Sequence, residues 1–280
     1  MSVQALLARG VVRRSWGALL GIALVLVLGL GAAITSIEAA DRTASAYPDY
    51  LDRAQVADVV VNPVLSNEHT LEIIEGVPGV VAVTSDSLLT AGPDTLDPGS
   101  GPGLFVQTRV SQDGRYQDQD RPIVRSGRMV RSGREAFLNV AAAEAMAVEV
   151  GDELPLTFYG INTPDPTSSD PGPAVHHARV RVVGIGTFAD DVLVDELYPR
   201  YRILVTPEAA ASADCLQFVP EADDPRSFFE LLLAAVPSDC AMTYRYYSLT
   251  VEGGADAAPA VVAEMGRRFR AENEHLPAAL

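Results

Sequence analysis

The chain has 280 residues, of which 37 are acidic and 21 are basic, and its formal net charge is −16. This length is enough for one large domain or two small ones. The negative charge repels nucleic acid and anionic lipid headgroups, so we expect no nucleic-acid partner.

Residues 15–37 form an apolar run without a charged side chain, and Arg9, Arg13 and Arg14 precede it. As a helix the run is about 34 Å long, which spans a hydrocarbon core of roughly 30 Å. Arginines on the N-terminal side predict a cytoplasmic N-terminus. We therefore expect a cytoplasmic leader at 1–14, a single transmembrane helix at 15–37 in the lipid bilayer of the cell membrane, and an extracytoplasmic domain at 38–280.

The run exceeds the apolar core of a secretory signal, which has about 7–15 residues, so a retained anchor is expected. Gly17 and Gly21 are four residues apart, as are Gly29 and Ala33. Small residues at this spacing allow membrane helices to approach closely, which predicts a helix-packing face. The alternative is that these glycines reflect only the ordinary composition of membrane helices.

Short strands and short helices alternate after the apolar run. Residues 56–61, a helix from Ser66 to Gly76 and residues 80–85 predict a β-α-β unit. The further strands are expected at 104–110, 136–140, 153–158, 179–185, 201–206 and 242–252, with helices at 141–147, 224–237 and from 256, and with loops at 91–103 and 161–177. A slip in the alternation at Tyr246 and Tyr247 predicts a β-bulge.

Long crossover helices are missing from this pattern, so the expected fold class is α+β: an N-terminal transmembrane helix followed by a mixed α+β extracytoplasmic domain. The domain can form two lobes, of which one consists of residues 120–205 and is inserted in the sequence of the other.

The sequence provides little evidence for catalysis. His176 and His177 are adjacent and would point to opposite faces of a strand, and the pair Asp190–Asp191 lacks the further oxygen ligands of a calcium loop. A P-loop and a G-x-S-x-G elbow are both missing from the sequence. We expect no catalytic residue, no metal and no cofactor.

The two cysteines are Cys215 and Cys240. Outside the cytoplasm such a pair is expected to form a disulfide, which would add roughly 3 kcal/mol of stability. The alternative is two buried thiols.

Several patterns along the chain resemble one family. They are the sequence of residues 13–16 before the apolar run, the segment 39–50 followed by 57–61, Pro-Gly-Val at 78–80, Gly-Arg at 127–128 before the strand–helix–strand of 137–158 with Gly151-Asp152, the strand at 182–185, and Gly-Gly-Ala-Asp at 253–256. Over about residues 12–272 the chain is similar to the N-terminal part of FtsX-like, or MacB-type, ABC transporter permeases.

The resemblance implies a domain of the MacB periplasmic-core type in a permease subunit. Its partners would be a cytoplasmic ABC ATPase subunit and further permease membrane helices or a second permease copy. Such permeases couple ATP-driven motion to export or mechanotransmission. After residue 37 no apolar run of membrane-spanning length follows, so a truncated N-terminal part is expected.

Two other interpretations remain open at this point. The chain can be a stand-alone membrane-anchored extracytoplasmic binding module, which would bind its partner without an ATPase. It can also be an anchored enzyme, in which case the outer part would show turnover that one His or Ser substitution abolishes.

Overall fold

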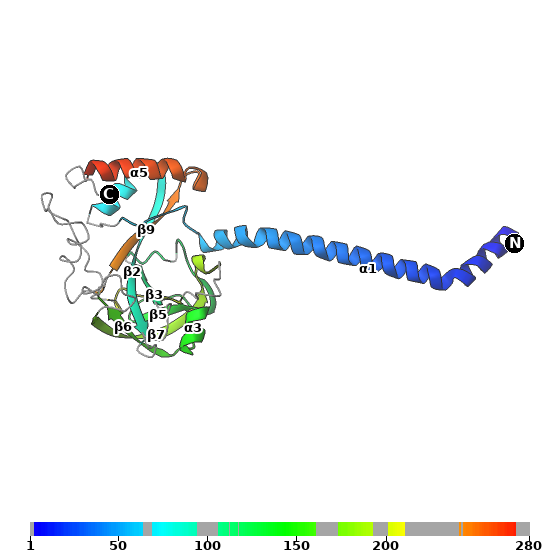
Figure 1. The fold of residues 1–280 in the computed structure, drawn as a ribbon, viewed down its shortest axis with the longest axis horizontal. Coiled ribbons are helices and arrows are strands. Elements are labelled where there is room, and N and C mark those ends of the chain that lie inside the picture. The colour runs from blue at the N-terminus through cyan, green and yellow to red at the C-terminus, as the bar shows by residue number, and fades with distance from the viewer. Residues whose placement is uncertain are drawn as a thin grey trace. The chain divides into compact units, whose positions relative to one another are not determined.

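The computed structural model describes residues 3–63, 69–93, 106–111, 113–116, 118–160, 173–192, 201–210, 241 and 243–272. Its contacts divide the chain into two units, Met1–Asp52 and Arg53–Leu280 (Figure 1).

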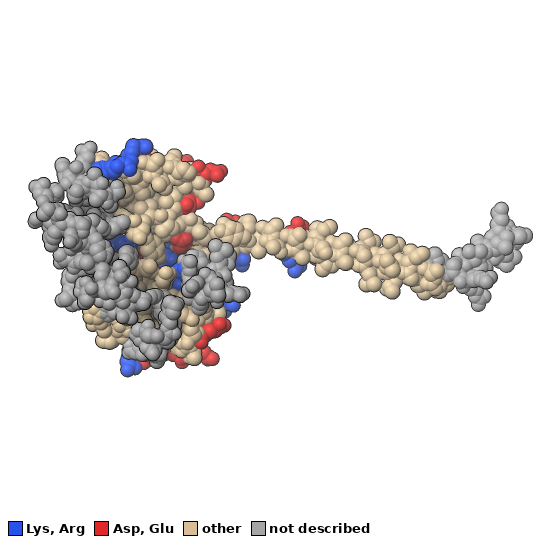
Figure 2. Space-filling view, viewed as in Figure 1, with Lys and Arg blue, Asp and Glu red and all other residues tan. Residues whose placement is uncertain are grey.

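The first unit lies within helix α1 (Val3–Ala54), which contains the whole apolar run. The large apolar side chains of this run from Leu20 to Ile37 are exposed, and Figure 2 shows this stretch as a surface without charged atoms. Among the described residues, α1 is the one helix long and apolar enough to cross a membrane. The helix does not stop at the end of the run but continues through Pro48 to Ala54.

Six strands of the second unit close into a ring, which we call the barrel. In order around the ring they are β2 (Val80–Pro93), β3 (Val106–Ser111), β8 (Tyr201–Val205), β5 (Glu135–Asn139), β7 (Ala174–Thr187) and β6 (Glu153–Tyr159), which returns to β2. Alternate residues point inward and fill the barrel, among them Val110, Leu138, Phe158 and Val180. Helix α3 (Val140–Met146) packs on this core through Ala142 and Ala143.

A second core lies where β2 extends beyond the barrel. Here β1 (Val59–Val61), β9 (Thr243–Val251) and the first half of β2 form a sheet whose one face is covered by α2 (Thr70–Glu75) and α5 (Ala258–Glu272). Figure 1 shows α5 running along this end of the unit. Ile74, Val261 and Met265 of the helices pack against Val83 and Leu249 of the sheet.

Strand β9 lies between β1 and β2 and runs antiparallel to both. The predicted strand–helix–strand unit therefore forms with β1 and β2 parallel, but a strand from much later in the chain separates them. The register shift falls between Val80 and Ala82, and the pairing at Tyr246 and Tyr247 is regular, so the prediction of a bulge there was wrong. Tyr247 is buried on one face of the sheet, and Tyr246 is half-buried on the other. Two adjacent aromatic residues therefore interrupt the apolar–polar alternation although the strand itself is regular.

Two predicted loops begin or end as strand. Residues Ala91–Pro93 pair with Leu156–Phe158, and His176 and His177 of β7 pair with Phe158 and Thr157. Strand β4 (Ile123–Gly127), which we did not predict, pairs with β7 at the sheet edge. The remaining residues of the two loops and the helix predicted at 224–237 lie outside the described residues.

Glycines permit a close approach at the β4–β7 contact. A Cβ atom built on Gly184 would lie 2.1 Å from the carbonyl oxygen of Arg128, and one on Gly186 would lie 2.1 Å from the carbonyl oxygen of Ile123. Both would also press on the ring of Phe137. These positions therefore require the absence of a side chain.

Candidate functional site

A buried polar cluster lies on the sheet face opposite α2 and α5. On β9, Tyr247 and Leu249 pack into the helix-covered core, so alternation places Tyr246 and Ser248 on the other face. Asp86 pairs with Tyr246 in the β2–β9 ladder and therefore shares that face. The same alternation puts Leu88 of β2 and its neighbour Arg109 of β3 there.

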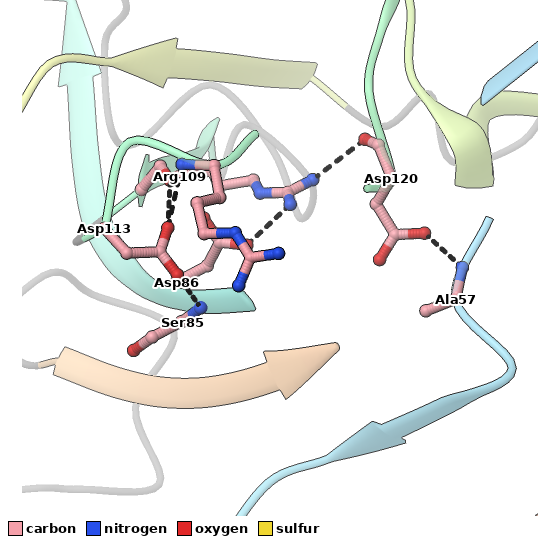
Figure 3. Close-up of polar contacts among 8 residues, drawn as sticks. Ala57, Ser85, Asp86, Arg109, Asp113 and Asp120 are labelled. Atoms are coloured by element: carbon pink, nitrogen blue, oxygen red, sulfur yellow. Dashed lines mark hydrogen bonds and ion pairs between the residues drawn. The ribbon is translucent and has the colours of Figure 1, made fainter. Parts of the chain in front are cut away.

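Arg109 is the centre of this cluster. Its Nη2 lies 2.6 Å from Oδ2 of Asp86, and the two side chains are 12% and 0% exposed. Its Nη1 donates to the carbonyl oxygen of Asp120 at 3.4 Å, as Figure 3 shows. The guanidinium carbon lies 5.7 Å from the centroid of the Tyr246 ring, a cation–π distance.

Burial dominates the protonation of this pair. It raises the pKa of Asp86, and the charge and hydrogen bond of Arg109 oppose that shift. Burial also lowers the pKa of Arg109, but Tyr246 and Asp86 outweigh it and hold the pKa above its ordinary value. Arg109 therefore remains a cation.

The segment that begins the second unit is tied to the same cluster. Asp120, whose φ of 49° is left-handed, accepts a hydrogen bond from the Ala57 N–H at 2.9 Å and donates its own N–H to Gln55 at 3.0 Å. Arg121 donates from its backbone to Ala54 and from Nε to the carbonyl oxygen of Arg53. Backbone from 53 to 57 is thus held by four hydrogen bonds to residues 120 and 121.

A cavity of about 570 Å³ opens beside Arg109. One wall is apolar and includes Val56, Val60, Leu88 and Phe188. The polar lining includes Arg109, Arg202, Asp120 and Ser248. This volume and mixture are typical of sites for small organic molecules.

Unsatisfied polar atoms are concentrated here. Arg109 and Ser248 belong to the cavity lining, but Arg109 Nε and Ser248 Oγ are themselves closed to solvent and have no hydrogen-bond partner among the described residues. Thr84 Oγ1 and Asp86 Oδ1, on the same sheet face, are also buried without a hydrogen-bond partner among the described residues. Buried polar atoms are normally paired, so each of these calls for an explanation.

The residues singled out from the sequence lie elsewhere. Gly17, Gly21, Gly29 and Ala33 lie in α1, where a Cβ atom built on any of the three glycines would meet no atom within 4 Å. Their helix-packing role remains a prediction. Cys215 and Cys240 lie outside the described residues, and their disulfide remains a prediction as well.

His176 and His177 are placed in separate surroundings. The ring of His176 lies 5.6 Å from that of Phe158, and its pKa is lowered by burial and by nearby positive charge, whereas Nδ1 of His177 lies 2.9 Å from Thr157 Oγ1. Over the described part of the chain, no three His, Cys, Asp or Glu side chains gather as metal ligands would.

Asp191 lies 3.2 Å from Arg202 Nε and accepts a hydrogen bond from Asn139 Nδ2. We did not predict a role for Asp86 or Arg109. Their only signal is a charged residue inside a predicted strand or at its end, and strand alternation makes such a residue look solvent-facing. The contacts of Arg109 with Asp120 and with Tyr246 of β9 come from other parts of the chain and are not visible in the local pattern.

Comparison with known proteins gives structural similarities alone. A scan against protein-family models finds no match, and no curated protein matches the chain. The extracellular domain of the ABC-type transporter YknZ from Gram-positive bacteria is 15% identical, with a TM-score of 0.39 over 76% of this chain and 87% of that one. The periplasmic region of MacB from Actinobacillus actinomycetemcomitans is 10% identical, with a TM-score of 0.37 over 75% of each chain.

Proposed function

We propose that the chain is the membrane-anchored, extracytoplasmic part of a MacB-type ABC transporter permease. The observation that carries this proposal is the exposed apolar surface of α1, joined in one chain to a compact α+β unit. An apolar helix surface of this size requires lipid or other membrane helices around it. The order of sequence patterns from residue 13 to residue 256 supports the choice of family.

In this role the chain binds no cofactor and carries out no chemistry of its own. A separate cytoplasmic ATPase supplies the energy, and further permease helices or a second copy pack against the small-residue pairs Gly17–Gly21 and Gly29–Ala33. The leader at 1–14 lies in the cytoplasm, and the domain from residue 38 lies outside.

Reporter fusions test the orientation. Alkaline phosphatase fused after Glu272 should be active, because it folds only outside the cytoplasm, and green fluorescent protein fused there should be dark. The reverse result would place the domain in the cytoplasm and overturn the proposal.

Photocrosslinking tests the partners. A photoreactive residue at Ala33 should crosslink to another membrane helix in native membranes. The matched control is Val27, which is about 120° around the helix from Ala33 and should crosslink mainly to lipid. Equal absence of protein crosslinks at both positions would instead favour a stand-alone anchored binding module.

A further inference from the structure

The cavity beside Arg109 has a mixed polar and apolar lining that the proposed transporter role does not use. It combines a wall of apolar side chains with the side chains of two arginines, Arg109 and Arg202. We propose that it binds a small amphipathic carboxylate, with the carboxylate at Arg109 and the alkyl part against Val56, Val60 and Leu88. This inference does not depend on the proposed function.

The guanidinium groups of Arg109 and Arg202 indicate which chemical group lies at the polar end of the ligand. Asp86 holds Nη2 of Arg109, and Asp191 lies beside Nε of Arg202, but neither aspartate lines the cavity. The ligand therefore meets the arginine nitrogens while the aspartates lie behind them. Arg109 and Arg202 line the cavity and their side chains are 12% and 11% exposed, so these guanidinium groups are the cations that a ligand there meets.

A carboxylate satisfies this arrangement better than other small groups. It accepts hydrogen bonds in the plane of a guanidinium, and such charge-assisted bonds are about twice as strong as neutral ones. The carboxylate of Asp120, the one acidic group in the described lining, is already engaged by the Ala57 N–H.

The apolar wall of the cavity indicates that the other end of the ligand is an alkyl chain. Val60 of β1 is 61% exposed although it lines the cavity, so it lies at the rim. Leu88 and Phe188 continue the apolar wall inside. A chain of about eight carbons fits a cavity of this size with room to spare.

Calorimetry on the full chain in lipid nanodiscs tests the proposal, with empty nanodiscs as the blank. The probe is octanoate, and octanamide and octylamine are its matched neutral and cationic analogues. We expect saturable octanoate binding, with octanamide at least tenfold weaker and no saturable binding of octylamine. Octanoate heat equal to that of empty nanodiscs would overturn the site, and equal affinity for octanamide would overturn the carboxylate.

Two variants locate the binding. Val60→Trp fills the rim without touching an ion pair and should weaken octanoate binding at least tenfold. The control Val81→Trp changes another valine on an exposed strand position, 66% exposed and outside the cavity lining, and should leave binding unchanged. Equal binding by wild type and Val60→Trp would overturn the location.

Arg109→Lys keeps the positive charge beside Asp86 but removes the guanidinium fork. We expect at least tenfold weaker binding with near-UV circular dichroism unchanged. Should this variant fail to fold, the Val60 and Val81 pair still decides the question. Full affinity in a folded Arg109→Lys protein would contradict recognition by Arg109.

Discussion

Gly184 and Gly186 of β7 lie against backbone carbonyl oxygens and the Phe137 ring, at distances that no Cβ atom tolerates. Their role is thus to let β4 and β7 approach each other over an aromatic side chain. The Val-Gly-Ile-Gly pattern of residues 183–186 records this contact in the sequence.

We predict that Gly186→Ala destabilises the protein by about 2–4 kcal/mol, because backbone must move to admit the methyl group. Gly266→Ala is the matched control. Gly266 lies in α5 and faces only the flexible end of Arg270, so alanine there should be neutral or stabilise by up to about 1 kcal/mol. Urea unfolding in detergent, followed by near-UV circular dichroism, measures both. Equal effects would show that the contact is absent.

Glu135 gives the protein a pH-dependent stability. Arg128 binds its two carboxylate oxygens at 2.5 and 2.9 Å, and the Arg131 N–H adds a third bond. The hydrogen bond from Arg128, opposed by burial and aided by the Arg131 N–H, lowers the pKa of Glu135 from 4.5 to about 2. A lowered carboxyl pKa stabilises the fold above the unfolded pKa, and this stability is lost as the pH falls from about 4.5 toward 2.

We therefore predict that wild type loses about 1–2 kcal/mol more than Glu135→Gln when urea unfolding is compared at pH 6 and pH 3. The figure is kept low because Arg128 is 41% exposed and solvent screens the pair. Identical pH profiles for the two proteins would show that the pair contributes nothing.

At the scale of elements, α5 stabilises the second unit through one face. Met265 is 3% exposed and packs in the core, whereas Val262 is 48% exposed. Met265→Ala should cost about 2–4 kcal/mol through a lost side chain and a cavity. Val262→Ala should change stability by less than 1 kcal/mol, since little burial is lost and alanine favours helix. Similar unfolding midpoints for the two variants would contradict this packing.

Sequence pattern predicted most of the individual elements of the described chain. Asn139, which accepts from Ala142 N–H and caps α3, marks the boundary between β5 and α3, and the turn at Gly151-Asp152 precedes β6 as expected. These signals are local, so they are legible in a short window.

The predictions that were wrong concern residues whose structure depends on partners far away in the sequence. Ala91–Pro93 looks like a loop because of its glycine and proline, yet β6 recruits it as strand. The cavity could not be predicted at all, because its lining comes from segments as far apart in the sequence as Val56, Arg109 and Ser248. Nothing in any one of these segments signals the others.

At the scale of the whole molecule, the two units have separate solubility requirements. The chain beyond residue 37 carries 18 basic and 37 acidic residues, a net charge of 18 − 37 = −19, whereas α1 exposes an apolar surface. Charge of this size favours solubility in water.

We predict that a variant lacking residues 1–37 folds in water without detergent, because the described cores of the second unit draw on no residue before Ala54. Its near-UV circular dichroism should match that of the full chain, and its unfolding should be cooperative. The full chain without detergent should precipitate. A soluble variant that binds hydrophobic dyes and lacks near-UV signal would show that the second unit cannot fold by itself.

The position of β9 has a consequence for the order in which the sheet can assemble during synthesis. Val59 pairs with Leu249, so β1 has no neighbour in the described sheet until the ribosome has made residues 247–249. The barrel strands are complete by Val205 and can close earlier. Strands β1 and β2 must therefore wait with open edges while the barrel forms, and the interval before β9 arrives is when the nascent chain is most exposed to wrong strand pairing and most dependent on chaperones.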